Sequence, residues 1–598
     1  MPTRDGWPEN DDPRGAVEGS AMKVLFSNPP WWIKRFEFAG DDAPASAWFS
    51  GVRAGSRWPH TNQAHSAPGN FVFGEYLPYP FFMGYAATYA AKATGAKVTF
   101  RDSIALRESY DSYFQHLREE RYEYIFIETA TPCWDHDQTI VRRVKEILPD
   151  TKIVLTGAMS AKGEAVMEQF PIHAVIQGEY EKGSVRVLNG ASGVLPHELL
   201  TVAEMNAAPY PYFDDVIAHR YWDVNPAGQK APQLQVWASR GCPYKCIFCV
   251  WPATMTGNDP DGTGKRSVRF YEPDYVEGML RELVERYGYR SIYFDDDTFN
   301  LGDRHVLGIC EVMTRIGLPW SAMCRADTIK LETWRAMRDS GCFGVKLGFE
   351  SGNQWVNDNI VNKRLNLETA RTAVHEIKRL GMTVHGTFTY GLPGETREQM
   401  QDTKSYIASL PLDTFQETGC GEIEGTPMST LREKGHLDRY AGAALDEQYL
   451  YVPDGGEKMR RLSEGDLAIG ADKAKSSSDY LIRQWRALGA AVTGAAADGP
   501  VALWGVGTDF FETLGQVPAL KPLITEGRVR LFDGKLAGQS LDGAPVEAPA
   551  ALPGFAGPVF LTPRIVSSRT AMRQDAARLG IPAAALRDLY DDAPVLAE

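Results

Sequence analysis

The chain has 598 residues, a formal net charge of -14 and a hydrophobic fraction of 43%. At roughly 150 residues per domain this length predicts three or four domains, because a single hydrophobic core does not grow so large. The negative charge and the lack of a Lys/Arg-rich run argue against a nucleic-acid binder, since phosphate contacts need a basic surface. We therefore expect a multidomain protein that binds no nucleic acid.

The sequence contains neither a membrane-span pattern nor a secretion signal. No stretch reaches the roughly 18 unbroken apolar residues that a spanning helix requires. Residues 1–20 are rich in Pro, Gly, Asp and Glu, which predicts a disordered tail. Three of the eight cysteines lie within eight residues, unlike a secreted disulfide framework. We expect a cytoplasmic protein whose thiols stay reduced.

Residues 21–195 predict a first domain with a parallel sheet covered by helices, because short apolar runs alternate with helical segments. Its candidate strands are Val24–Ser27, Val98–Arg101, Tyr124–Glu128, Ile153–Thr156 and Ala174–Ile176. Small or polar residues follow the later strands, where doubly wound folds bind their ligands. The insertion Pro29–Pro78 is too long for an ordinary connection and predicts a functional loop.

Residues 196–232 predict a linker, and residues 233–440 predict a second α/β domain. Its candidate strands are Gln235–Ser239, Ser291–Phe294, Ser321–Arg325, Gly344–Phe349 and Thr383–Tyr390. Five or six repeats suffice for a partial or full barrel, whose chemistry gathers at the carboxyl ends of its strands.

Residues 441–498 predict a helical connector, and residues 499–598 a small Rossmann-like accessory domain. There Gly505-Val506-Gly507 follows a strand, but Phe510 occupies the third glycine position of a dinucleotide-binding turn. We expect this domain to recognise substrate or to dock, with nucleotide binding as the weaker alternative.

Three cysteines follow the first predicted strand of the second domain. Cys242, Cys246 and Cys249 have C-x3-C-x2-C spacing. Three thiolates from one loop can bind three irons of a 4Fe-4S cluster and leave the fourth iron open. A zinc site is the alternative, but structural zinc uses four ligands and the next cysteine is Cys310. The spacing favours an iron-sulfur cluster over zinc or unrelated buried cysteines.

This loop, with Phe248 before its last cysteine, resembles the cluster loop of the radical S-adenosylmethionine (SAM) superfamily. The resemblance implies that the open iron binds SAM, and that an electron donor such as flavodoxin or ferredoxin drives its cleavage to a 5'-deoxyadenosyl radical. A solvated acidic turn remains the alternative for Asp295–Asp297, and an internal pair with Asp327 remains the alternative for Arg325. The implied SAM contacts are Asp295, Asp296, Asp297, Arg325, Glu350, Ser351 and Gly391.

A parallel-sheet domain directly before a radical SAM domain resembles the cobalamin-dependent subclass. The first strand lacks a following G-x-G-x-x-G, which disfavours a dinucleotide. The resemblance implies that Thr129, Thr131, Gly157 and Gly178 border cobalamin, although turn roles remain open for the glycines. Many cobalamin domains have a D-x-H-x-x-G motif whose His binds the cobalt. The sequence that starts at Asp102 lacks this His, so methylcobalamin without a His lower ligand is expected.

The predicted class is α/β, with a Rossmann-like cobalamin-binding domain, a central radical SAM partial (β/α) barrel and a small C-terminal α/β domain. The resemblance implies methyl transfer to an unactivated carbon of a small or medium-sized metabolite. Ring formation, ring contraction or oxidation without methyl transfer stay open, as does a non-catalytic cobalamin sensor. No catalytic acid or base is assigned. Cys420, Glu422 and Glu424 are expected in a surface turn, with a substrate acid or hydrogen donor in this late loop as the alternative.

Overall fold

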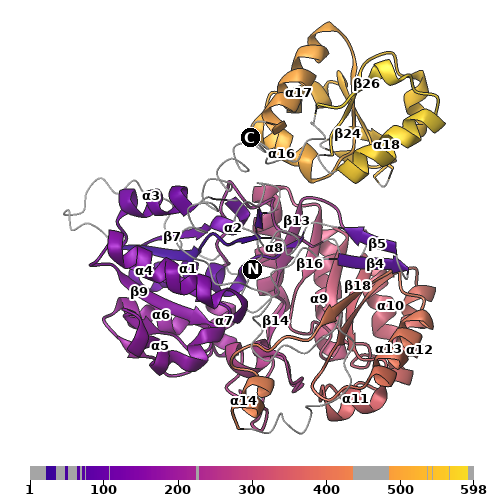
Figure 1. Ribbon diagram of the computed structural model, residues 1–598. Coiled ribbons are helices and arrows are strands. Elements are labelled where there is room, and N and C mark those ends of the chain that lie inside the picture. Colours follow the sequence, from indigo (N-terminus) through magenta and orange to yellow (C-terminus); the bar gives the residue numbers. More distant parts are fainter. Residues whose placement is uncertain are drawn as a thin grey trace.

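Three mainly parallel sheets flanked by helices make up the described protein, which confirms the predicted α/β class (Figure 1). The computed structural model describes residues 22–34, 48–50, 63–67, 70–73, 76–106, 108, 110–223, 226, 228–434, 484–534, 536–541, 543–563 and 566–589. The predicted tail and most of the predicted connector lie outside these residues. No helix among the described residues is long and apolar enough to cross a membrane.

The N-terminal sheet has the strand order β11-β10-β9-β8-β1-β7, and all its strands are parallel. The order β7-β1-β8-β9-β10 is that of flavodoxin-like folds, whose ligands bind where the strand order reverses. Here that point lies between the carboxyl ends of β1 and β8. The strands are β1 Lys23–Asn28, β7 Lys97–Asp102, β8 Tyr124–Thr129, β9 Lys152–Gly157, β10 Ala174–Val175 and β11 Gly193–Val194.

Alternating side chains bury both faces of this sheet. Phe26 stacks on Phe126 at 4.5 Å on the face covered by α1, and Leu25 and Ile125 face α3 and α4 in a separate core. The unbroken apolar runs Val24–Phe26 and Tyr124–Ile127 therefore belong to strands that are covered on both faces. The helices are α1 Phe81–Thr94, α2 Ser103–Leu106, α3 Tyr110–Glu120, α4 Trp134–Ile147, α5 Gly163–Gln169 and α6 Tyr180–Leu188.

The central sheet has six parallel strands in the order β13-β16-β17-β18-β19-β20. They are β13 Gln233–Val236, β16 Ser291–Phe294, β17 Trp320–Cys324, β18 Cys342–Glu350, β19 Thr383–Tyr390 and β20 Thr414–Gly419. The helices outside it are α8 Pro273–Tyr287, α9 Asp303–Ile316, α10 Leu331–Asp339, α12 Leu367–Arg379 and α13 Arg397–Ala408. The sequence analysis did not identify β20.

The long N-terminal insertion contributes two strands to the central sheet. β4 (Gln63–Ala67) pairs antiparallel with β20, and β5 (Asn70–Phe73) pairs with β4. Figure 1 shows this indigo hairpin at the edge of the central domain. The insertion predicted to be a functional loop therefore extends the partial barrel.

Helix α1 joins the first two domains. Phe81 stacks on Trp237 with ring centroids 4.4 Å apart, and Phe82 stacks on Trp251 at 5.0 Å. These residues belong to one hydrophobic cluster that also includes the N-terminal sheet. A shared apolar core fixes the two domains against each other.

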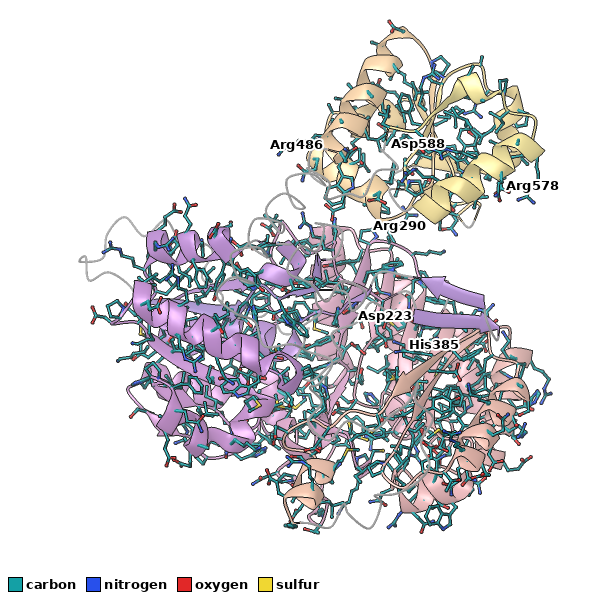
Figure 2. All side chains as sticks on the ribbon, viewed as in Figure 1. Asp223, Arg290, His385, Arg486, Arg578 and Asp588 are labelled. Carbon is teal, nitrogen blue, oxygen red and sulfur yellow. The ribbon has the colours of Figure 1, made fainter. Side chains whose placement is uncertain are left out.

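The C-terminal sheet has the order β23-β24-β22-β21-β25-β26, parallel except for β23. Its strands are β21 Val501–Trp504, β22 Val529–Phe532, β23 Ser540–Leu541, β24 Ala544–Glu547, β25 Val559–Leu561 and β26 Leu586–Arg587. Its principal helices are α16 Thr508–Gln516, α17 Leu520–Thr525 and α18 Val566–Arg578. Arg290, labelled below this domain in Figure 2, donates to the Ser540 carbonyl oxygen at 3.1 Å.

Candidate functional site

The three cysteines lie in one loop that follows β14 (Ser239–Arg240), with Cys242 buried and Cys246 and Cys249 half-buried. Burial raises the pKa of Cys242 to about 11. Burial also raises the pKa of Cys249, to which nearby Asp297, Cys246 and Cys242 add. Because these sites disfavour thiolates, a bound cation is needed to hold all three sulfurs deprotonated.

Two of the predicted acidic residues fasten this loop. Asp296 accepts from the Ser239 hydroxyl at 2.6 Å and from the Ala238 amide at 3.1 Å. Asp297 accepts from the Gly241 amide at 3.1 Å and from the Thr256 hydroxyl at 3.2 Å. These carboxylates hold the backbone on either side of Arg240, immediately before Cys242.

Gly241 must be glycine for a geometric reason. Its φ is +92°, and an added Cβ would lie 2.4 Å from the Ser267 carbonyl oxygen. Both the left-handed backbone and the close contact exclude a side chain. The third predicted carboxylate, Asp295, is 1% exposed, and its carbonyl oxygen accepts from the Trp237 indole at 2.9 Å.

Arg325 supports the cysteine loop from the end of β17. Its guanidinium forks onto Asp327, with the second bond at 3.0 Å, as in the internal pairing weighed for the sequence. It also donates to the Lys363 carbonyl oxygen at 2.9 Å and lies 3.7 Å from the ring centre of Tyr244, between the first two cysteines. All three donor nitrogens of Arg325 therefore have protein partners.

Glu350 and Lys363 place a charged pair beside the second cysteine. Lys363 Nζ donates to Glu350 Oε1 at 2.9 Å, and the Thr389 hydroxyl donates to Glu350 Oε2 at 3.0 Å. Burial raises the pKa of Cys246, while Lys363 opposes this shift. Lys363 thus favours the thiolate form of Cys246.

The remaining predicted SAM contacts lie at the same carboxyl edge of the central sheet. The Ser351 side chain is fully buried; its hydroxyl hydrogen-bonds that of Thr403 at 3.1 Å. Gly391 has φ +66° and begins the turn that ends at Glu395. Burial raises the pKa of Glu395 to about 7, and its Oε1 has no hydrogen-bond partner within the described protein.

The predicted cobalamin contacts lie at the carboxyl edge of the N-terminal sheet, mostly against protein atoms. Thr129 donates to the Thr156 carbonyl oxygen at 2.5 Å. A Cβ on Gly157 would lie 2.1 Å from the Thr129 carbonyl oxygen, and one on Gly178 would lie 2.8 Å from that of Glu198. Both glycines have positive φ, so each serves a tight turn.

The carboxyl edges of the two sheets meet through the loop that follows β20. The Glu424 amide donates to the Thr131 hydroxyl at 2.9 Å, and Lys162 Nζ donates to Glu424 Oε1 at 2.7 Å. Cys420 and Glu422 are 5% and 4% exposed, so the expectation of a surface turn is wrong for both. Cys420 and Glu422 are buried within the central domain, and Glu424 is the residue of this loop that contacts the first domain.

A buried ion-pair cluster that sequence reasoning missed joins the first domain to the cysteine loop. Arg240 pairs with Glu181 at 2.8 Å and with Glu179 at 3.2 Å, and Arg269 pairs with Glu179 at 2.8 Å. The sequence features that could have indicated this cluster are the Glu-x-Glu at the start of α6 and the Arg before Gly241. A single sequence gave no means to pair them across about sixty positions.

The fold and the thiol loop define the class of this protein. Residues 238–407 match the model of the Radical SAM superfamily, so the central part of the chain is a radical SAM domain. The matched range includes the three cysteines, Asp295–Asp297, Arg325, Glu350, Ser351 and Gly391.

The chain is similar to several known proteins. The chain is 27% identical over 371 residues to an uncharacterised methyltransferase of Pyrococcus horikoshii, covering 58% of this chain and 77% of that protein. It is 30% identical over 252 residues to cytidylyl-2-hydroxyethylphosphonate methyltransferase of Streptomyces wedmorensis, covering 39% of this chain and 44% of that relative.

A solved structure of the radical SAM methyltransferase TsrM from Kitasatospora setae, with cobalamin and a [4Fe-4S] cluster bound, aligns with a TM-score of 0.47 and 16% identity. The alignment covers 69% of this chain and 78% of that chain.

Proposed function

We propose that this protein is a cobalamin-dependent radical SAM methyltransferase that methylates a carbon atom of a small or medium-sized metabolite. The observation that carries the proposal is the convergence of three thiols in the radical SAM domain, at an edge facing the ligand-binding edge of a flavodoxin-like sheet. The methyltransferase relatives support methyl transfer over ring formation or oxidation. Cobalamin, the substrate and the methylated carbon belong to the proposal.

The residues of the thiol loop fit a 4Fe-4S cluster better than a single zinc ion. Among the described residues, no group of three His, Cys, Asp or Glu side chains is arranged to hold one metal ion. Cys246 raises the pKa of Cys242, and both raise the pKa of Cys249, so the three thiols lie near one another. Cys242, Cys246 and Cys249 would hold the cluster, which has several irons to reach separate sulfurs.

The N-terminal sheet fits a large, uncharged cofactor. Its strand order reverses beside Thr129, and the Ser160 hydroxyl near the end of β9 is 1% exposed with no hydrogen-bond partner. Asp102 accepts from Asn28 at 2.8 Å and caps Ile104 and Ala105, and no His follows it in α2. Thr129, Thr131, Gly157 and Gly178 would border cobalamin, with no His ligand below it from this strand.

When bound, the cluster and SAM supply one-electron cleavage to a carbon-centred radical, and cobalamin supplies the methyl group. The chain's own residues orient these groups. Asp296 and Asp297 fix the loop that carries the thiols, Arg325 braces it through Tyr244, and Lys363 balances charge beside Cys246. Glu350 and Gly391 offer a carboxylate and a turn for SAM at the barrel edge.

Anaerobic reconstitution with iron, sulfide and cobalamin tests the proposal. With SAM carrying a CD3 methyl group, a low-potential donor such as flavodoxin or ferredoxin and a cytoplasmic metabolite extract, we expect 5'-deoxyadenosine, S-adenosylhomocysteine and a CD3-labelled product together. Mass spectrometry measures all three. 5'-Deoxyadenosine without label transfer indicates a ring-forming or oxidising enzyme, and neither nucleoside product indicates a sensor; both results contradict the proposal.

A further inference from the structure

The interior of the radical SAM barrel is polar along its whole depth. On β18, β19 and β20 the residues that alternate inward include Lys346, Gly348, His385, Thr387 and Gln416. Their neighbours along the strands pack outward instead, as Phe349 and Phe388 do with ring centroids 5.2 Å apart. Strand alternation thus separates an apolar shell from a polar lumen.

Exposure of the inward side chains changes along the lumen. Met323, Gly348, Thr387, Thr389 and Gln416, toward the carboxyl ends of the strands, are partly exposed. One layer deeper, Lys346 is 5% exposed and His385 is fully buried. The lumen is therefore open at the edge that carries the thiol loop and closed at the level of His385.

The segment before β13 closes the lower end of the lumen and binds its polar groups. Asp223 accepts from Lys346 Nζ at 2.5 Å and exchanges two hydrogen bonds with Gln233. The Gln229 side chain donates to the Ser321 hydroxyl at 2.9 Å. Figure 2 shows Asp223 and His385 in the central domain. This floor is a network of paired groups.

His385 departs from this pattern. Its Nδ1 hydrogen-bonds the Thr414 hydroxyl at 2.8 Å, but its Nε2 is buried and has no hydrogen-bond partner in the described protein. Burial and the nearby Lys346 hold the pKa of His385 well below its usual value, so the ring is neutral. A buried polar atom left unpaired costs about 1–3 kcal/mol, which a ligand can recover.

The charges around the lumen favour a neutral ligand. Lys346 is paired with Asp223, and Lys363, above Gly348, is paired with Glu350 at 2.9 Å. Both lysines facing the described lumen are thus neutralised, whereas anion recognition uses cations that are available to the ligand. Thr387, Thr389 and Gln416 both donate and accept, which suits hydroxyl groups.

We infer that the barrel lumen above His385 binds a neutral, hydroxyl-bearing substrate, and that His385 Nε2 is its deepest hydrogen-bond partner. The reaction that this substrate undergoes rests on the proposed function, but the binding does not. A neutral imidazole accepts or donates one hydrogen bond at Nε2 according to its tautomer, so a hydroxyl satisfies it in either form.

Two isosteric variants separate binding from folding. His385→Asn keeps an amide near the Nδ1 position for Thr414 and removes the group at Nε2, whereas His385→Gln places an amide near Nε2. His305→Asn is the matched control, because His305 Nε2 is also buried without a partner but lies on the outer helix α9. Thermal melts verify that each full-length variant folds.

The probe is a metabolite extract of the cells that make the protein, split by anion exchange into neutral and anionic fractions. Each fraction is ultrafiltered with the full chain, and mass spectrometry identifies what is retained. We expect a neutral hydroxylated compound, retained about tenfold less by His385→Asn, as for the loss of one hydrogen bond. The wild type, His385→Gln and His305→Asn should retain it alike.

Several results overturn the inference. They are retention of anionic compounds only, retention of nothing, equal retention by folded His385→Asn, or weaker SAM binding by that variant, which would assign the lumen floor to SAM. Failure of the proposed function appears separately, as missing 5'-deoxyadenosine and S-adenosylhomocysteine. A neutral ligand bound through His385 would stand even then.

Discussion

The carboxyl edges of the N-terminal and central sheets, which face each other, differ in the side chains that line them. On the radical SAM side, charged groups pair around the thiol loop: Arg325 with Asp327, Lys363 with Glu350, and Arg240 with Glu181. On the N-terminal side, Thr129 and Gly157 pack against backbone. Substitutions at the first edge should therefore act through a change of charge or of metal ligand. Substitutions at the second edge should act through the size of the side chain.

The largest expected effect is loss of a thiol. Cys249→Ala leaves a cluster with two protein ligands, so iron and sulfide content and 5'-deoxyadenosine formation should fall to background. Elemental analysis and chromatography measure both. Cys310→Ala is the control, because Cys310 is a buried cysteine of the same domain that lies on α9, and this variant should keep its iron.

A substitution of Arg240 tests the charged groups at the carboxyl edge of the central sheet and leaves the three cysteines unchanged. Arg240→Met leaves Glu181 buried without its cation, while Glu179 keeps Arg269, and breaking a buried pair costs about 3–5 kcal/mol. Denaturant unfolding measures the loss. Arg281→Met removes a solvent-exposed partner of Glu277 and should cost about 0–1 kcal/mol. Equal losses would contradict a special role for the buried cluster.

The stability of the protein should depend on pH through Glu395. Burial raises the pKa of Glu395 from its ordinary value of 4.5 to about 7 in the folded state, so between these values the folded state holds a proton that the unfolded state has released. The free energy of unfolding should therefore fall by on the order of 3 kcal/mol as pH rises through that window, then level off. Glu395→Gln should flatten this slope in unfolding curves; an unchanged slope would refute the assignment.

The smallest expected effect comes from a larger side chain at the carboxyl edge of the N-terminal sheet. Gly157→Ala adds a methyl group 2.1 Å from the Thr129 carbonyl oxygen at a positive φ, and should cost about 2 kcal/mol and weaken cobalamin binding. Gly95→Ala, also at positive φ but with nothing within 4 Å, should cost about half as much and leave cobalamin binding intact. Unfolding and absorbance titrations compare them.

The sequence was most informative where chemistry requires particular residues at short spacing. The cysteine loop and β19, predicted over its full range Thr383–Tyr390, depend on local pattern. β20, Thr-Phe-Gln-Glu-Thr-Gly, has one large apolar residue and no strand signal of its own. Its pairing with β4 joins residues some 350 positions apart, as in Phe415 with His65.

Long-range partners also changed the roles of predicted residues. Arg325 was predicted to bind a cofactor carboxylate, and that contact stays a prediction, while the structure occupies its donors with Asp327 and two carbonyl oxygens. The burial of Cys420 comes from Leu392 and Ile247, far away in sequence. The Arg325–Asp327 pair is local and was an alternative in the sequence, whereas the carbonyl contacts of Arg325 and the burial of Cys420 do not follow from local spacing.

The most direct test of the central claim is electron paramagnetic resonance of the reduced, anaerobically reconstituted protein before and after addition of SAM. A 4Fe-4S cluster held by three thiols has one open iron, so the account predicts a cluster signal whose shape changes when SAM binds. A signal unchanged by SAM, or a protein that contains zinc in place of iron and sulfide, would contradict it.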